Sequence, residues 1–277
     1  MNPVSVVIIT RNEENNIVDC IRSARLVSDD IIIVDALSAD DTVRLAENEG
    51  ARVYSVDWKG YGYARNYGAA HAKHNWILAL DADERMTPVL TATIARQALN
   101  DPTTIYCFKR VNYLGERRIR YGTLGFETVK RIYNRRHCSW DLTLVHERLT
   151  GAQAIRKIIP GHIAHYGLKN LEDYRNKAVV YAQMSAEKYL LEGKRNNWIK
   201  RLGSPLFNSV KSYVFQLGFL DGKQGFQIAS IIAYYTWLKY DCLQTLISEA
   251  NALPQTETEV SFSPARKIEA ASNSTFS

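Results

Sequence analysis

The chain has 277 residues, 46% of them hydrophobic and 23% charged, which allows a real hydrophobic core and excludes a wholly disordered protein. Its formal net charge of +6 favours anionic partners such as phosphates, acidic lipids or nucleic acids, without choosing among them. The four cysteines stand far apart, without the CxxC or Cys–His spacing of a zinc site, which argues against a structural metal or a disulfide framework.

Strand and helix patterns alternate along the first hundred residues. Unbroken apolar and β-branched runs predict strands buried on both faces of a parallel sheet, and apolar residues at helical spacing predict helices between them. The predicted strands are 4–9, 31–34, 51–56 and 76–80, and the predicted helices are 13–26, 42–49, 63–73 and one that starts at Pro88 with Thr87 as its N-cap. This series predicts an α/β fold with a mostly parallel sheet and ligands at the carboxyl ends of its strands.

The pattern changes after residue 100. Residues 105–111 and 129–133 are predicted to form antiparallel or edge strands around an arginine-rich stretch, and residues 171–191 to form a long helix. Residues 196–247 are predicted to form a helical hairpin, broken near 218–225. Beyond residue 253, Pro, Thr, Ser and Glu dominate, which is typical of a disordered tail. The predicted domains are 1–192 for the α/β domain, 193–252 for a C-terminal helical extension and 253–277 for the tail.

Two carboxylates, Asp81 and Asp83, flank Ala82 directly after the fourth predicted strand. At this spacing they project from the carboxyl edge of the sheet toward the same space. Mg²⁺ and Mn²⁺ prefer oxygen ligands and keep positions open for water and phosphate, which a nucleotide diphosphate supplies. The alternative is a turn in which the acids only cap the helix that starts near Pro88. The position after a parallel strand favours a metal and nucleotide site.

A third carboxylate, Asp35, follows the second predicted strand. At the end of a strand it could accept a hydrogen bond from a base N–H or a ribose hydroxyl. The alternative is that the acidic and hydroxyl side chains here cap the next helix. We favour capping for Ser38 and Asp40 and a ligand role for Asp35.

Four short segments occur in order along the first ninety residues. They are Ile9-Thr10-Arg11-Asn12-Glu13-Glu14, the series Asp35, Ser38, Asp40 and Thr42, the series Gly62, Ala64, Arg65 and Asn66, and Leu80-Asp81-Ala82-Asp83-Glu84. Together they resemble family 2 glycosyltransferases, and more narrowly the branch that acts in lipopolysaccharide core and surface-polysaccharide assembly. The resemblance is dense over residues 4–90 and thinner up to 190.

The resemblance implies a GT-A fold, a UDP-sugar donor, transfer of a hexose such as glucose with inversion, and a divalent cofactor, Mg²⁺ or Mn²⁺. By the same resemblance Thr10 and Glu13 lie beside the nucleoside, Asp35 binds the base, Asp81 faces the ribose or the metal, and Asp83 binds the metal. The full set expected to bind the nucleotide sugar is Thr10, Arg11, Glu13, Asp35, Arg65, Asp81 and Ala82.

An inverting transfer needs a base that takes the proton from the acceptor hydroxyl. Val145-His146-Glu147 matches the place where this branch carries a His-Glu pair, so Glu147 is the first candidate and Asp141 the second. Alternatively, Glu147 forms an ion pair with Arg148 or another nearby arginine. His165 is a further candidate ligand for the metal or the diphosphate, with a packing role as its alternative.

The acceptor side is less well defined. Residues 122–128 read Gly-Thr-Leu-Gly-Phe-Glu-Thr, where the close relatives are expected to carry a Gly-Trp and Pro-Asp pattern. Nine basic residues between 109 and 136 form either a solvated basic face or a grip for the phosphates or carboxylates of an anionic glycolipid or polysaccharide acceptor. They are Lys109, Arg110, Arg117, Arg118, Arg120, Lys130, Arg131, Arg135 and Arg136.

The C-terminal helices carry one apolar run, residues 228–238, which is too short to span a bilayer. With neighbouring aromatic residues and lysines it could lie in the membrane interface, so a peripheral membrane contact is expected. The alternatives are a homo-oligomer interface or packing on the α/β domain. Because no signal peptide is visible, we expect a cytoplasmic protein at the inner face of the cytoplasmic membrane.

Three hypotheses for the whole chain remain open. The first is a metal-dependent inverting hexosyltransferase. The second is a catalytically silent nucleotide-binding scaffold, against which the carboxylates Asp81, Asp83 and Glu147 argue. The third is a nucleotidyltransferase, which usually needs a glycine-rich loop where this chain has Thr10-Arg11-Asn12-Glu13. Nucleic acid is not an expected partner, because the aromatic residues are not interleaved with the basic run.

Overall fold

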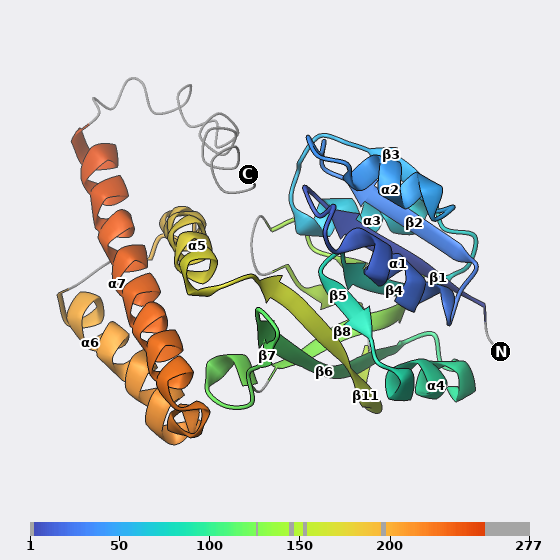
Figure 1. The fold of residues 1–277 in the computed structure, drawn as a ribbon. Helices are drawn as coiled ribbons and strands as arrows, with labels where there is room; N and C mark the ends of the chain where they lie inside the picture. The colour runs from blue at the N-terminus through green and yellow to red at the C-terminus, as the bar shows by residue number, and fades with distance from the viewer. Residues whose placement is uncertain (1–2, 126, 144–146, 152–153, 195–197, 253–277) are drawn as a thin grey trace. The chain divides into compact units, whose positions relative to one another are not determined.

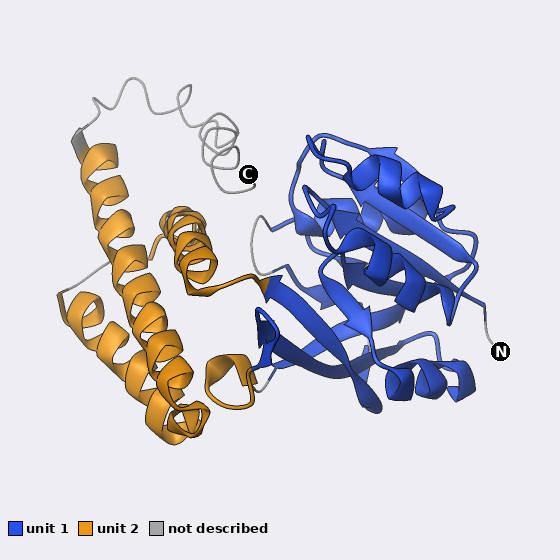
Figure 2. Ribbon diagram, viewed as in Figure 1, with its two compact units in different colours: residues 1–118, 126–167 blue, residues 119–125, 168–277 orange. Residues whose placement is uncertain are grey.

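The computed structural model describes residues 3–125, 127–143, 147–151, 154–194 and 198–252. The chain divides into two compact units, coloured separately in Figure 2. Unit 1 comprises residues 1–118 and 126–167, and unit 2 comprises residues 119–125 and 168–277. The predicted tail over 253–277 lies outside the described residues, as does His146 of the expected His-Glu pair.

The first part of unit 1 is a parallel sheet with helices between its strands (Figure 1). Its elements are β1 (Val4–Thr10), α1 (Ile17–Arg25), β2 (Asp30–Asp35), α2 (Thr42–Asn48), β3 (Arg52–Ser55), α3 (Tyr61–Ala70) and β4 (Trp76–Asp81). The strands lie in the order β3-β2-β1-β4, and each neighbouring pair is parallel. The predicted α/β fold is confirmed. The helix predicted over 13–26 is shorter, because the Glu13 carbonyl oxygen accepts hydrogen bonds from the N–H groups of Asn16 and Ile17 in a turn that precedes α1.

The second part of the sheet is antiparallel. The elements after β4 are β5 (Glu84–Met86), α4 (Pro88–Arg96), β6 (Thr104–Leu114), β7 (Arg117–Arg118), β8 (Glu127–Asn134), β9 (Ser139–Trp140), β10 (Leu149–Thr150) and β11 (Ile155–Leu168), with a 3₁₀ turn, η1 (Thr123–Gly125), before β8. Of these, β9 and β10 pair with each other in a separate two-stranded sheet. The sheet continues from β4 through β8, β6 and β11 to β5. Within the described residues β6 and β8 are therefore interior strands, so the antiparallel prediction is confirmed and an edge position for them is wrong.

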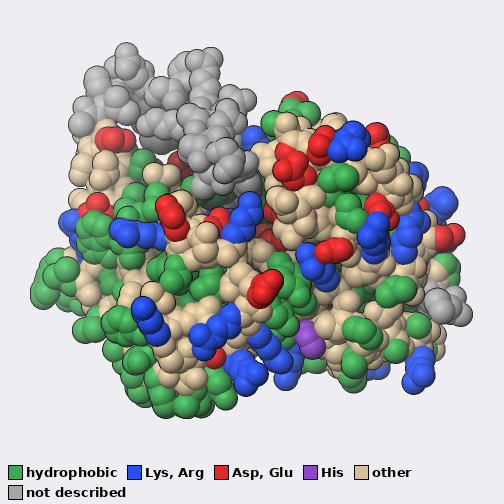
Figure 3. All heavy atoms as spheres, viewed as in Figure 1, with side chains coloured by type: hydrophobic (Ala, Val, Ile, Leu, Met, Phe, Trp, Pro, Cys, Tyr) green, Lys and Arg blue, Asp and Glu red, His purple; other side chains and the backbone are tan. Residues whose placement is uncertain are grey.

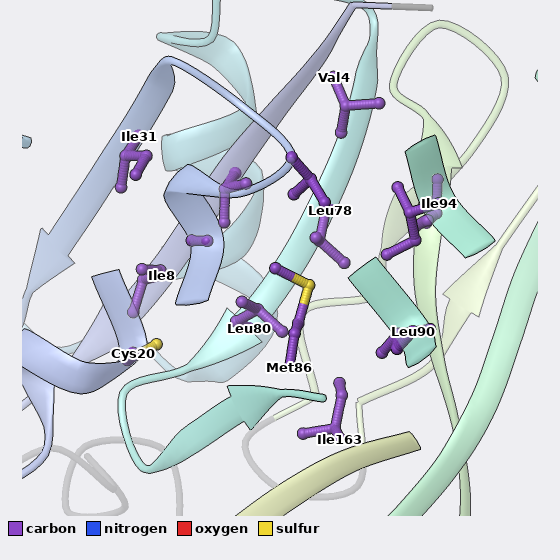
Figure 4. Packing of buried hydrophobic residues seen from close by; sticks show 14 of the residues in the cluster. Val4, Ile8, Cys20, Ile31, Leu78, Leu80, Met86, Leu90, Ile94 and Ile163 are labelled. Atoms are coloured by element: carbon purple, nitrogen blue, oxygen red, sulfur yellow. The ribbon is translucent and has the colours of Figure 1, made fainter. Parts of the chain in front are cut away.

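The core lies on both faces of the sheet, because successive strand residues point to opposite faces. Ile8 of β1 packs in the cluster that α1 and α4 cover, whereas Val7 and Ile9 pack in the cluster beneath α3. Figure 4 shows part of the first cluster, in which side chains of β4, β5, α4 and β11 meet. The helix α3 lies close to the sheet, since a Cβ on Gly68 would come within 2.4 Å of Val7 Cγ1.

Unit 2 contains the C-terminal helices. They are α5 (Leu171–Leu191), α6 (Trp198–Val210), a π-helical turn η2 (Lys211–Phe215), a 3₁₀ turn η3 (Gly218–Asp221) and α7 (Lys223–Ala252). The hydroxyls of Ser185 and Tyr235 lie 3.0 Å apart and join α5 to α7, as do the rings of Tyr189 and Tyr240. By its packing α5 belongs with α7, although the sequence places it in the first domain. No helix in the described residues is long and apolar enough to cross a membrane.

The short segment 119–125 also belongs to unit 2. The carboxylate of Asp221 accepts hydrogen bonds from the backbone N–H groups of Arg120, at 3.0 Å, and Tyr121, at 2.9 Å. The backbone N–H of Thr123 donates to Ser212 Oγ at 3.1 Å. The connection between β7 and β8, predicted to face the acceptor, is therefore held by the turns between α6 and α7.

Candidate active site

The candidate site lies at the carboxyl edge of the parallel strands. Thr10 at the end of β1 pairs in register with Asp35 at the end of β2, and Ile9 pairs with Asp81 at the end of β4. The three polar residues therefore end adjacent strands, as the sequence predicts. Thr10 and Asp35 are both buried, at 7% and 1% exposure. Parallel sheets of this kind bind ligands at this edge.

Asp35 is held by a residue of its own loop. Its Oδ2 accepts a hydrogen bond from the backbone N–H of Ser38 at 2.9 Å, and its Oδ1 accepts from Ser38 Oγ at 2.5 Å. Ser38 therefore orients Asp35, and its predicted capping of the next helix is wrong. Asp40 does contact the start of α2, since its Oδ1 accepts from the backbone N–H of Thr42 at 3.1 Å.

The loop after β1 is tied to the loop after β2. Asn12 has a positive φ of 53°, a conformation that asparagine tolerates better than most residues. Its backbone N–H donates to Ser38 Oγ at 2.8 Å, and the backbone N–H of Glu13 donates to Thr42 Oγ1 at 2.8 Å. Arg11 is partly buried in the same loop. These contacts give the polar residues of both loops a shared structural role beside the strand ends.

Asp81 lies between two buried arginines. Its Oδ1 accepts from the guanidinium of Arg65 on α3 at 2.6 Å, and its Oδ2 accepts from Arg131 on β8 at 2.9 Å. Both arginine side chains are only 4% exposed. Burial alone would raise the pKa of Asp81, but the positive charges of Arg131 and Arg65 outweigh it and lower that pKa. Glu84, which is fully buried, shares Arg131 and accepts from the backbone N–H of Asp81 at 3.1 Å.

Asp83 points to a histidine instead of an arginine. Its Oδ2 lies 3.2 Å from Nε2 of His165 on β11, and Ala82 between the two carboxylates is buried. The other ring nitrogen of His165, Nδ1, lies 2.6 Å from Asn112 Oδ1. Asn112 in turn donates to Glu127 Oε2 at 2.9 Å. Because an amide oxygen only accepts hydrogen bonds, Asn112 holds the proton of His165 on Nδ1 and leaves Nε2 directed at Asp83.

The pair of Asp83 and His165 fits a divalent cation in its chemistry and its space. A carboxylate oxygen and an imidazole nitrogen are donors that Mn²⁺ accepts. A Cβ on Gly167 would lie 2.6 Å from both Asp83 Oδ2 and His165 Nε2, so the glycine leaves open the space that these donors share. Burial would lower the pKa of His165, but the Asp83 carboxylate raises it above its ordinary value. In the described residues no group of three or more His, Cys, Asp or Glu side chains forms a metal cluster.

The segment that carries the candidate bases is attached to α3. Asn66 pairs with the backbone of Trp140, donating to its carbonyl oxygen at 2.8 Å and accepting from its N–H at 3.0 Å. A Cβ on Gly62 would come within 1.9 Å of the Asp141 carbonyl oxygen, so only glycine permits this approach. The motif residues Gly62 and Asn66 thus bring the segment that begins at Trp140 close to Arg65.

The two candidate bases have different surroundings. Glu147 forms an ion pair with Arg65, so its predicted alternative, pairing with a nearby arginine, is present in the structure. The same arginine contacts Asp81 and stacks on the Trp140 ring, with Cζ 4.6 Å from the centroid. Asp141 accepts from Thr143 Oγ1 at 2.6 Å and from the backbone N–H of Arg148 at 3.1 Å, which fixes its own loop. Of the two, Glu147 is the one joined to the carboxyl edge.

The basic run between residues 109 and 136 is not one surface. Arg131 forms ion pairs with Asp81 and Glu84. Arg110 forms an ion pair with Glu127, with its Nε 2.7 Å from Oε2 of the carboxylate. Arg135 donates to the backbone carbonyl oxygens of Ala69, in the last turn of α3, and of Ala72, just after it. Lys130 donates to the backbone carbonyl oxygen of Leu149. The interpretation of the run as a single solvated face or acceptor grip is therefore wrong for these four. The exposed members are Lys109, Arg117, Arg118, Arg120 and Arg136.

Sequence reasoning missed the residues that support the site from the antiparallel strands. They are Glu84, Arg110, Asn112, Glu127 and Arg131. The available signal was the alternation of polar residues along β6, where Arg110 and Asn112 share a face. Their partners became clear only from the pairing of β6 with β8, in which Arg110 lies opposite Glu127.

The fold and the site define an α/β protein with carboxylates, a histidine and buried arginines at the carboxyl edge of parallel strands. A model of the family described as glycosyl transferase family 2 matches residues 5–159. The match covers more than half of the chain. The chain therefore belongs to glycosyl transferase family 2, and its resemblance to that family is confirmed.

Several named proteins are similar to this chain. An uncharacterized glycosyltransferase of Rickettsia typhi is 27% identical over 89% of this chain and 88% of its own. The lipopolysaccharide core biosynthesis glycosyltransferase LpsC of Rhizobium meliloti is 26% identical over 85% of this chain and 90% of its own. Among solved structures, glucosyl-3-phosphoglycerate synthase from Mycobacterium tuberculosis with Mn²⁺ and UDP-glucose is 27% identical, with a TM-score of 0.34 over 40% of this chain and 44% of that one.

Proposed function

We propose that this glycosyltransferase moves a hexose, such as glucose, from a UDP-sugar to a glycolipid or polysaccharide acceptor of the cell envelope, with inversion at the anomeric carbon. The observation that carries the proposal is the pairing of Asp83 with His165 beside the Asp81–Arg65 ion pair, in a chain of family 2. UDP, the hexose and inversion are carried over from the resemblance. The similarity to a lipopolysaccharide core glycosyltransferase supports the envelope acceptor.

In this proposal Asp83 and His165 would hold Mg²⁺ or Mn²⁺ next to the diphosphate of the donor. When bound, such an ion neutralises negative charge on the leaving diphosphate. Asp81 has both oxygens on arginines, so it serves the site mainly by keeping Arg65 and Arg131 in place. Asn112 and Glu127 orient His165, as the outer partners of metal-binding histidines commonly do.

The nucleoside is proposed to bind at the ends of β1 and β2. Thr10, Arg11 and Glu13 lie along its side, and Asp35, held by Ser38, accepts from the base. Ala82 brings its backbone to the same edge, where its N–H donates to the carbonyl oxygen of Ile9 at 3.2 Å. These proposed roles depend on the register of β1 with β2, which brings the two strand ends and the loops after them together.

The proton of the acceptor hydroxyl is proposed to go to Glu147. Its ion pair with Arg65 fixes the carboxylate at the same edge as Asp81, where the attacking oxygen must arrive. Asp141 is the second candidate, and its hydrogen bonds within its own loop make it the weaker one. A positioned base of this kind contributes about 10²–10⁴-fold to the rate.

The acceptor determines where the enzyme works. A lipid-linked acceptor places the reaction at the inner face of the cytoplasmic membrane, so we propose a cytoplasmic enzyme with peripheral membrane contact. The exposed arginines around β7 provide bidentate donors for the phosphates or carboxylates of such an acceptor. A homo-oligomer is the alternative use of the C-terminal surface.

A panel of nucleotide sugars, measured by thermal shift with and without Mn²⁺, tests the donor and the metal together. A ligand at 100 times its Kd adds roughly 2.7 kcal/mol to the free energy of unfolding. We expect that stabilisation for a UDP-sugar with Mn²⁺ and much less for GDP- or ADP-sugars. Equal stabilisation by all of them would contradict the donor assignment. UDP-sugar binding without any transfer or hydrolysis would support the silent scaffold, and pyrophosphate release from a nucleoside triphosphate would support a nucleotidyltransferase.

A further inference from the structure

One surface of unit 2 exposes large apolar side chains. It is formed by α6, the turns that lead into α7 and the first turn of α7, and we call it the α6 face. Its main members are Trp198, Leu202, Leu206, Phe207, Phe215 and Phe226. Trp198 is 73% exposed and Phe215 76%. Figure 3 shows hydrophobic side chains gathered over this part of the molecule.

The opposite side of α6 is already used within unit 2. Pro205 is buried, and Asn208 Nδ2 donates to Thr236 Oγ1 of α7 at 3.2 Å. Trp198, Leu202 and Leu206 follow one another at intervals of four residues, so they lie along one side of the helix. A helix that packs on a neighbour normally shows a polar outer side to water. The exposed apolar side of α6 therefore indicates a surface that binds something else.

The α6 face carries an excess of positive charge, which favours an anionic partner. Between Trp198 and Phe226 the chain has four basic residues, Lys200, Arg201, Lys211 and Lys223, and one acid, Asp221. Asp221 is buried at 7% exposure and accepts hydrogen bonds from backbone N–H groups, so its charge is turned inward. Arg201 pairs with Asp241, whereas the three lysines are exposed. A second copy would bring two positive surfaces together, but an anionic lipid surface neutralises them.

We propose that the α6 face docks on an anionic lipid bilayer. Its aromatic and leucine side chains enter the boundary between headgroups and acyl chains, and its lysines contact lipid phosphates. The helix lies in the plane of the surface. This inference deepens the proposed function, because it brings a lipid-linked acceptor to the enzyme. The segment 119–125, held by Asp221 and Ser212 between α6 and α7, would then be fixed close to the docked surface.

Flotation of the full-length chain with vesicles tests the docking. The vesicles contain phosphatidylcholine alone or with phosphatidylglycerol, at low and high salt. Lys211→Glu with Lys223→Glu removes the attraction of two lysines, which lowers the partition coefficient about 30-fold or more. Phe207→Ser with Phe215→Ser removes apolar area, which lowers it about tenfold per residue. Lys59→Glu with Lys73→Glu is the matched control, since it changes the net charge equally at exposed lysines of unit 1.

We expect binding to phosphatidylglycerol vesicles that high salt weakens, loss in both α6-face variants, and parental binding by the control. Circular dichroism spectra must match in all four proteins. Absent binding, equal binding to both vesicle types, or parental binding by the folded variants would overturn the docking. A dimer of the parent that the α6-face variants dissolve would assign the surface to a second copy. The flotation contains no nucleotide sugar, so its failure leaves the proposed transferase untouched, and a failed transferase assay leaves the docking untouched.

Discussion

The two aspartates of the Asp-Ala-Asp segment should differ in what they do for the protein. Asp81 neutralises Arg65 and Arg131, whose side chains are each only 4% exposed, whereas Asp83 faces His165. Removing one member of a buried ion pair costs about 3–5 kcal/mol, because it leaves a buried charge uncompensated. In Asp81→Asn, Arg65 keeps its ion pair with Glu147 and Arg131 keeps its ion pair with Glu84. We therefore expect Asp81→Asn to lower the free energy of unfolding by about 3 kcal/mol, the lower end of that range.

Asp83→Asn should leave stability nearly unchanged, because the amide keeps the shape and no buried arginine loses its partner. For a unit of this size, 1 kcal/mol corresponds to about 2–4 °C in Tm, so Asp81→Asn should lower Tm by about 6–12 °C and Asp83→Asn by less than about 4 °C. Mn²⁺ titration by calorimetry should show the reverse order, with the larger loss in Asp83→Asn. Equal losses of Tm in the two variants, or parental Mn²⁺ affinity in Asp83→Asn, would refute this division of roles.

Gly167→Ala places a methyl group 2.6 Å from Asp83 Oδ2 and His165 Nε2, so Mn²⁺ affinity measured by calorimetry should fall about 10–100-fold; parental affinity would mean that the ion does not sit between them. Glu147→Gln should lower kcat about 10²–10⁴-fold with UDP-sugar affinity nearly unchanged, and if kcat instead fell in Asp141→Asn, Asp141 would be the base. Burial would raise the pKa of Asp30, but hydrogen bonds from Ser5, the Lys73 backbone and Arg52 lower it. Its stabilisation is therefore full above about pH 4 and is lost as the pH falls further. Urea unfolding should show Asp30→Asn destabilised by about 2 kcal/mol at pH 7, because the charged hydrogen-bond acceptor is lost, with a smaller difference at pH 3. A difference that did not depend on pH would contradict this.

The parallel half of the fold could be predicted because its signals are local. The strands around Ile8, Ile33 and Leu78 are buried on both faces, which requires continuous apolar runs that are visible in the sequence. The 14-residue strand β11 was not predicted, since Pro160, Gly161 and several polar residues interrupt any such run. Its position between β6 and β5 depends on pairing between segments far apart in the chain.

The candidate site also contains residues that local sequence signals could predict and residues that depend on pairing between distant segments. The positions of Asp81, Asp83 and Asp35 at the carboxyl edge could be predicted because each follows a recognisable strand. His165 was named as a candidate although its strand was not predicted. Arg131 and Asn112 were not found as site residues, because an arginine or asparagine inside a strand looks like any other polar position until its partner is known. Glu147 was predicted as the candidate base, with an ion pair as its alternative. The ion pair with Arg65 is present in the structure, and the role as base stays a prediction.

We propose that a divalent cation bound by Asp83 and His165 supports sugar transfer from a UDP-sugar. The most direct test is release of UDP from UDP-glucose, in the presence of candidate acceptors, by the parent and by Asp83→Asn, with Mn²⁺, with EDTA and with Mn²⁺ restored after EDTA. We predict turnover by the parent with Mn²⁺, its loss in EDTA and its recovery with added Mn²⁺, and no turnover by a folded Asp83→Asn variant. Turnover that survives both EDTA and the Asp83→Asn change would contradict the account.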